Sequence, residues 1–349
     1  MNSSRLPIIA PEQASPLRAY FKYILVSAYF IFIGFCAVGA WLKWEDMQYQ
    51  KRLAEYTSHV YEEGFEAVAV TVPLPPRERK ASFLERLARR TTPTPALVIK
   101  PERDESADAT WRKYAAAPVI VPENNAKVIL VIDDLGIVKG ATKEMIDMNA
   151  PLTLSFLPYA SNIASQVDEA YAKGHDILVH IPMEPKGNAD PGPHALLSST
   201  SPSEQMDSID YNLSQFSHYI GINNHMGSQY TENEDAVERL LNVVKEKGLL
   251  VLDSKTTNRS VLEEIALEKN IPVTNRDVFL DNNRDVPSIM AQLAELERVA
   301  KRDGTALAIG HPYPQTVDAL KQWIPTLADK GITIVPISQT IKEKMQDEI

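Results

Sequence analysis

The sequence lacks several features by which common classes of protein are identified. Cys36 is the only cysteine among 349 residues, so no disulfide can link two parts of the chain. No repeat at the spacing of a solenoid is visible, and no glycine-rich phosphate-binding loop follows the first predicted strand. These absences argue against a disulfide-stapled module, a solenoid and a nucleotide-binding domain. They leave one large domain with appendages.

Positive charge is scarce in the larger part of the chain. The formal net charge is −10, and it is unevenly distributed. The first 122 residues hold 16 Lys and Arg against 13 Asp and Glu, whereas the remainder holds 20 against 33. Because an acidic domain repels the phosphate backbone of nucleic acids, we expect no nucleic acid partner.

Charged side chains are absent from residues 23–42, an apolar run of roughly 20 residues, which is the length at which a helix crosses a bilayer core. Arg5, Arg18 and Lys22 precede the run, and Glu45 and Asp46 follow it. The positive-inside rule then predicts a cytoplasmic segment at 1–22, a transmembrane helix at 23–42 and an exported C-terminal part. The run is long for a cleaved signal peptide, which is the alternative. The predicted location is the inner membrane, with the C-terminal domain in the periplasm.

Residues 43–122 have a different composition from the rest of the exported part. Their first third is rich in charge, and prolines interrupt every periodic run between 71 and 122 apart from a short helical stretch. Such a composition is typical of an extended, semi-rigid spacer. We therefore place the folded domain at residues 123–349.

Short apolar runs alternate with amphipathic stretches from residue 127 onward. The predicted strands are 128–132, 152–156, 176–180, 219–223, 249–253, 271–275, 305–309 and 332–336. Gly174, Gly248, Gly304 and Gly331 each lie just before a strand, as glycines at helix C-termini do. About eight strand–helix units in about 220 residues predict a closed or nearly closed (β/α) barrel. A doubly wound open sheet is the alternative.

Ionisable residues follow many of the predicted strands, and the active residues of a parallel barrel collect at that end. Asp133 and Asp134 end the first strand. Two adjacent carboxylates repel each other unless a cation or a proton lies between them. We interpret the pair as one metal ligand beside one general base.

Three histidines end other predicted strands. His180 and His225 end the third and fourth strands, and a carboxylate with two imidazoles is a common ligand set for divalent zinc. Glu184, four residues after His180, is a further candidate ligand. His311, after the seventh strand, is a candidate general acid.

The remaining polar residues at the strand ends are candidates for substrate binding: Asn224, Asp253, Arg276 and Asp281. Asn224 and its neighbour Asn223 either orient His225 or bind sugar hydroxyls. Asp253 either orients a catalytic group or contacts the substrate. The sequence leaves these alternatives open.

Residues 127–338 resemble the divergent polysaccharide deacetylase family, a distant relative of the chitooligosaccharide deacetylases. The resemblance rests on motifs in order along the chain: Val-Ile-Asp133-Asp134-Leu-Gly, Gly174-His-Asp-Ile-Leu-Val-His180-Ile-Pro-Met-Glu184, Gly221-Ile-Asn-Asn-His225-Met-Gly-Ser, Leu252-Asp253-Ser-Lys-Thr256, Arg276-Asp-Val-Phe-Leu-Asp281 and Ile309-Gly-His311-Pro. It implies a distorted (β/α) barrel of seven or eight units, a divalent metal that is typically zinc, and a polysaccharide substrate. It also implies that Asp133 is the base, that Asp134 and His180 bind the metal, and that His311 is the general acid.

Two departures from the better-known relatives concern the site. Glu184 stands where the related motif ends in a histidine, so the third metal ligand stays open between Glu184 and His225. The Arg-x-Pro-Tyr motif of those relatives has no counterpart in this chain.

The predicted function is a metal-dependent hydrolase that removes N-acetyl or similar acyl groups from an envelope polysaccharide, such as peptidoglycan. One alternative is a non-catalytic envelope protein that keeps the fold and binds a glycan or a protein. Another is a glycoside hydrolase with Asp133 and Glu184 as paired carboxylates, which leaves the histidines unexplained.

The predicted membrane topology can be tested with a reporter fused after Ile349. Because the basic residues precede the apolar run, an alkaline phosphatase fusion should be active in intact cells, whereas a fusion that needs the cytoplasm should be inactive. A fusion active only in the cytoplasm contradicts the topology.

Overall fold

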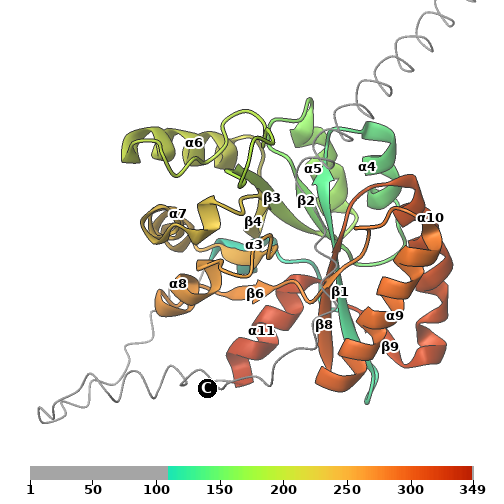
Figure 1. Ribbon diagram of the computed structural model, residues 1–349. Coiled ribbons are helices and arrows are strands. Elements are labelled where there is room, and N and C mark those ends of the chain that lie inside the picture. Colours follow the sequence, from blue (N-terminus) through green and yellow to red (C-terminus); the bar gives the residue numbers. More distant parts are fainter. Residues whose placement is uncertain (1–108, 348–349) are drawn as a thin grey trace, which may run out of the picture. The chain divides into compact units, whose positions relative to one another are not determined.

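Every strand pairing in the computed structural model, which describes residues 109–347, is parallel (Figure 1). The strands are β1 (Ala126–Leu135), β2 (Thr153–Phe156), β3 (Asp176–Met183), β4 (Gly221–Met226), β5 (Leu250–Asp253), β6 (Val273–Asn275), β7 (Val278–Phe279), β8 (Thr305–Gly310) and β9 (Ile332–Ile334). Eight of them coincide with the predicted strands. The one strand that was not predicted, β7, has only two residues and gives no periodic signal in the sequence.

The sheet curls round on itself. Its hydrogen-bonded order is β6-β5-β4-β3-β2-β1-β8-β7, and β9 pairs with β1 beside this path. The two end strands of the path are separated by only two residues, Arg276 and Asp277. The backbone N–H of Arg276 donates to Asp253 on β5, and that of Asp277 donates to Leu307 on β8. The structure therefore confirms the predicted parallel α/β architecture, in the form of a curled sheet of the barrel type.

Helices follow most of the strands and pack around the sheet (Figure 1). They are α3 (Thr110–Tyr114), α4 (Lys139–Ile146), α5 (Ile163–Ala172), α6 (Pro202–Ser214), α7 (Glu234–Glu246), α8 (Leu262–Glu268), α9 (Val286–Asp303), α10 (Pro314–Trp323) and α11 (Ile337–Asp347), with short 3₁₀ turns at Tyr230–Glu232, Ile324–Thr326 and Ala328–Lys330. The four glycines predicted at helix ends all have positive φ, as a helix C-terminal glycine requires.

Local sequence explains where the longer helices begin. Ser201 and Glu204 form a capping box at the start of α6, and Pro202 occupies its first turn. Asp285 accepts a hydrogen bond from the backbone N–H of Ser288 at the start of α9.

Alternation along the strands divides the apolar side chains into two layers. Val128, Leu130 and Ile132 of β1 belong to the larger cluster, which also contains buried residues of α4, α5, α7, α9 and α10. Ile129 and Val131 belong to a second cluster formed by residues of several strands and of α11. This second cluster is the interior of the curled sheet, and Trp111 of α3 closes it at the amino ends of the strands.

Residues 109–122, which the sequence analysis placed in the spacer, pack against the domain. The backbone N–H of Trp111 donates to Gly248, that of Ala116 donates to Asp176, and that of Val119 donates to Gln339. The rest of the predicted spacer, the apolar run at 23–42 and the segment 1–22 lie outside the described residues. Within residues 109–347 no helix is long and apolar enough to cross a membrane.

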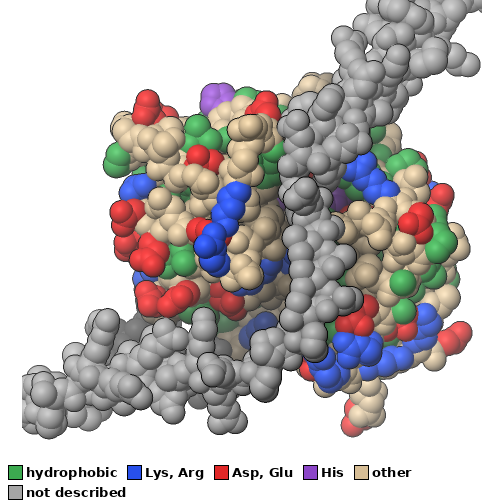
Figure 2. Space-filling model, in the orientation of Figure 1, with side chains coloured by type: hydrophobic (Ala, Val, Ile, Leu, Met, Phe, Trp, Pro, Cys, Tyr) green, Lys and Arg blue, Asp and Glu red, His purple; other side chains and the backbone are tan. Residues whose placement is uncertain are grey.

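Acidic side chains gather on the surface over α7 and α8 (Figure 2). The exposed members of this patch include Glu234, Asp235, Glu238, Glu264 and Glu268. Part of the negative charge of the C-terminal part of the chain therefore lies on this face.

Asp176 links the N-terminal segment to α11 and provides a test of the packing. Its carboxylate is fully buried and accepts hydrogen bonds of 2.8 Å from the backbone N–H groups of Ala116 and Ser338. Asp176→Ala leaves both donors without this acceptor, so the free energy of unfolding in urea should fall by about 1–3 kcal/mol. Asp329→Ala, at an exposed position, is the matched control. Equal stability of the two variants contradicts the role given to Asp176.

Candidate metal centre

Strand alternation places four of the site residues on the inner face of the curled sheet. Asp133, His180 and His311 each lie two positions after an interior apolar residue, namely Val131, Leu178 and Ile309. The fourth, Asn223, pairs in register with His180. Ile132 pairs with Gly310, so Asp133 and His311 follow at the same level. The four side chains therefore form a polar layer above the interior apolar cluster.

Asp134 reaches the same space by a backbone turn. Alternation alone would direct its side chain to the opposite face from Asp133. Its φ of 58° lies in the left-handed region, where the strand ends and the chain turns. Gly136 has a φ of 105°, and a Cβ there would lie 2.7 Å from Cβ of Ala160, so this tight turn requires glycine.

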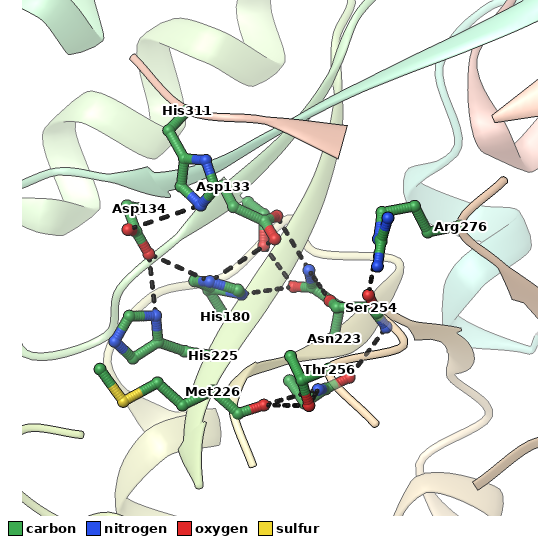
Figure 3. Close-up of polar contacts among 12 residues, drawn as sticks. Asp133, Asp134, His180, Asn223, His225, Met226, Ser254, Thr256, Arg276 and His311 are labelled. Carbon is green, nitrogen blue, oxygen red and sulfur yellow. Dashed lines mark hydrogen bonds and ion pairs between the residues drawn. The ribbon is translucent and has the colours of Figure 1, made fainter. Parts of the chain in front are cut away.

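Asp134, His180 and His225 form a cluster with the geometry of a metal site. One ligand atom from each lies within 4.8 Å of the other two. Oδ1 of Asp134 is 3.2 Å from Nε2 of His180 and 2.9 Å from Nδ1 of His225. Figure 3 shows His225 and His311 approaching Asp134 from opposite sides, with His180 between them.

The sequence left the third ligand open between Glu184 and His225, and the structure brings only His225 into this cluster. The carboxylate of Glu184 accepts hydrogen bonds from the backbone N–H of Ser198, at 2.7 Å, and from its hydroxyl. Glu184 therefore holds the loop between β3 and α6. His225 lies at the end of β4, where Met226 and Gly227 both have positive φ.

The charges around Asp134 favour its ionised form. Burial alone would raise the pKa of this carboxyl, but the positive charge of His225 and the hydrogen bonds from His180 and His225 hold it well below its usual range. One carboxylate oxygen and two imidazole nitrogens are the donor set that divalent zinc takes in sites with an open position. The residues present thus fit a divalent cation.

His311 is held by a carboxylate behind it. Its Nδ1 lies 2.9 Å from Oδ1 of Asp281, and its backbone N–H donates to Oδ2 of Asp281 at 2.5 Å. Thr316 also donates to Oδ2, at 2.8 Å. Nε2 of His311 lies 3.8 Å from Asp134. Although burial alone would lower it, the pKa of His311 rises to about 9, mainly because of the Asp281 charge.

Asp133 lies deeper than Asp134. Burial raises the pKa of its carboxyl, against the opposing effects of His180 and His311. Its Oδ1 accepts a hydrogen bond of 2.9 Å from Asn223, and its Oδ2 lies 3.7 Å from Nε2 of His180.

The residues predicted to bind substrate make hydrogen bonds within the protein. Asn224 accepts from the backbone N–H of Ser254, and Asp253 accepts from that of Lys255. Arg276 donates to the carbonyl oxygens of Ser254 and Lys255, at 2.8 and 3.0 Å. These contacts fix the loop after β5. Substrate contact by Asn224, Asp253, Arg276 and Asp281 stays a prediction.

The sequence analysis gave no role to Ser155, Ser254 or Thr316. Ser155 and Ser254 contact Asn223, and Thr316 contacts Asp281. The two-residue alternation could have identified Ser155 as an inward-facing residue, because it pairs in register with Leu178 of the interior cluster. A serine on an inward position of a buried strand is a sign of a polar layer.

Comparisons with known proteins identify similar chains of undetermined function. The uncharacterized protein YibQ of Escherichia coli K12 is 29% identical over 221 residues, which cover 63% of this chain and 69% of that protein. An uncharacterized protein of Haemophilus influenzae is 30% identical over 207 residues, which cover 58% of this chain and 73% of that protein.

The fold also matches a solved structure. The crystal structure of an uncharacterized protein from Agrobacterium tumefaciens C58 has a TM-score of 0.63 and 27% sequence identity, and the match covers 66% of this chain and 94% of that chain. The sequence model of the divergent polysaccharide deacetylases matches residues 130–341, which is most of the described domain. This chain belongs to the divergent polysaccharide deacetylase family.

Proposed function

We propose that the domain is a metal-dependent hydrolase that removes N-acetyl or similar acyl groups from an envelope polysaccharide, with peptidoglycan as one candidate. One observation supports this most directly. A buried carboxylate, Asp133, and a carboxylate-paired histidine, His311, lie beside the cluster of Asp134, His180 and His225 in a member of a deacetylase family.

Asp134, His180 and His225 would hold the metal. When bound, a divalent cation such as zinc would polarise the acyl carbonyl group and make a water molecule more acidic. The Asp134 side chain is 21% exposed, whereas that of His180 is 2% exposed. The cluster is thus open to a substrate at Asp134 and closed behind His180.

Asp133 would act as the general base. Asn223 occupies its Oδ1, and its Oδ2 is directed towards His180 at the edge of the cluster. From there the carboxylate can accept a proton from the water that attacks the carbonyl carbon. The C–N bond then breaks, which releases a carboxylate and an amine.

His311 would act as the general acid. Because Nδ1 of His311 donates a hydrogen bond to Asp281, its Nε2 faces the cluster and can donate a proton to the departing nitrogen. Asp281 would act through His311, as a positioning residue.

The exported location remains part of the proposal. An anchor at residues 23–42 would hold the domain on the side of the membrane where envelope polysaccharides lie. The acyl group and the polysaccharide are proposals that rest on family membership.

Metal content tests the ligand set. The wild-type protein should hold stoichiometric zinc after dialysis, and Asp134→Ala, His180→Ala and His225→Ala should each lose it because each removes one donor. Mass spectrometry with metal detection measures the content, and circular dichroism checks the fold. Glu184→Gln, which removes the competing candidate, should keep the metal. Loss of zinc in Glu184→Gln together with retention in His225→Ala contradicts the proposed set.

Turnover tests the acid and the base. Asp133→Asn removes the proton acceptor and His311→Ala removes the donor, so release of acetate from N-acetylated peptidoglycan fragments should fall by about 10²–10⁴-fold in each. His218→Ala changes a histidine outside the site, which stacks on Tyr171, and should leave turnover unchanged. If the wild-type protein binds metal and glycan but shows no turnover, the catalytic proposal fails. The alternative of a non-catalytic binding protein is then supported.

A further inference from the structure

We infer that Asn223 is a positioning residue which fixes the ring of His180 and orients Asp133 through one buried side-chain amide. The inference rests on the proposed function, because it assigns Asn223 a part in holding the metal ligand and the base.

The amide of Asn223 is the meeting point of the inner polar layer. The residue is 1% exposed. Its Nδ2 donates to Asp133 at 2.9 Å and to the hydroxyl of Ser254 at 3.1 Å. Its Oδ1 lies 2.9 Å from Nδ1 of His180 and accepts from the hydroxyl of Ser155. Groups from β1, β2, β3 and the loop after β5 therefore contact one side chain of β4 (Figure 3).

The partners determine which way the amide points. A carboxylate has only acceptor atoms, so the NH₂ group of Asn223 must face Asp133. The carbonyl oxygen then faces His180, and the opposite orientation would place two acceptors against each other.

This orientation sets which nitrogen of His180 faces the metal position. Because Oδ1 of Asn223 can only accept, Nδ1 of His180 carries the proton. Nε2, which faces Asp134 at 3.2 Å and donates a hydrogen bond to it, is then the nitrogen at which a cation would replace the proton. Without this contact the ring could rotate and turn either nitrogen towards Asp134. The amide therefore fixes Nε2 as the nitrogen at the metal position.

The same amide orients Asp133. By donating to Oδ1 it leaves Oδ2 towards the cluster, where the proposed base must accept its proton. Ser155 and Ser254 in turn fix the amide, because one donates to its oxygen and the other accepts from its nitrogen. Asn223 thus connects a metal ligand to the base without contacting substrate.

Three variants separate these roles. Asn223→Ala removes both contacts. Asn223→Asp keeps an acceptor for His180 but replaces the donor that faces Asp133 with a carboxylate oxygen. Asn212→Ala is the matched control, because Asn212 is an equally buried amide on α6 that bonds to the backbone of His194 and Ser208.

The first measurement is the Nδ1–H signal of His180 in ¹H–¹⁵N spectra of metal-free protein, assigned by its absence from His180→Ala. It should exchange slowly with water in the wild type, Asn212→Ala and Asn223→Asp, and quickly in Asn223→Ala. A signal unchanged by Asn223→Ala overturns the inference.

The second measurement is zinc affinity by competition with a chelator. Loss of the outer partner of a histidine ligand typically weakens metal binding by about 10–100-fold, which is the change expected for Asn223→Ala. Asn223→Asp should restore affinity while turnover stays low, and Asn212→Ala should bind as the wild type does. Failure of Asn223→Asp to restore affinity contradicts the inference. If the wild type binds no zinc, the proposed function fails, and the His180 signal still decides the role of Asn223.

Discussion

The structure depends on the two-residue alternation of parallel strands held in register around a curled sheet. Val131, Leu178 and Ile309 fill the interior, and the residues two positions further on are Asp133, His180 and His311. A shift of one residue in any pairing would move these side chains to the helix-covered face. The same register therefore builds the apolar interior and the polar layer above it.

Burying this many ionisable groups requires a partner for each of them. A buried polar group without a partner costs about 1–3 kcal/mol, and a charged one costs more. Asp281 pairs with His311, Asn223 joins Asp133 to His180, and Asp134 faces two imidazoles. Two ring nitrogens converge on one oxygen of Asp134, an arrangement that could also hold a cation.

Sequence reasoning located the strands and the candidate ligands because both follow from short-range patterns. Apolar runs and glycines at helix ends mark the strands, and a residue that ends a parallel strand must lie at the mouth of the barrel. The choice between Glu184 and His225 needed the positive-φ turn at Met226 and the contact of Glu184 with Ser198. The link between Asn223 and Asp133 spans 90 residues, and no local pattern encodes it.

The central claim is that Asp134, His180 and His225 bind one divalent cation. Crystals of the protein grown with zinc, measured at the zinc absorption edge, test it most directly. The account predicts a single anomalous peak in the cluster, about 2.0–2.2 Å from one oxygen of Asp134 and one nitrogen of each histidine. Absence of a peak at saturating zinc, or a peak bound by Glu184 in place of His225, would contradict it.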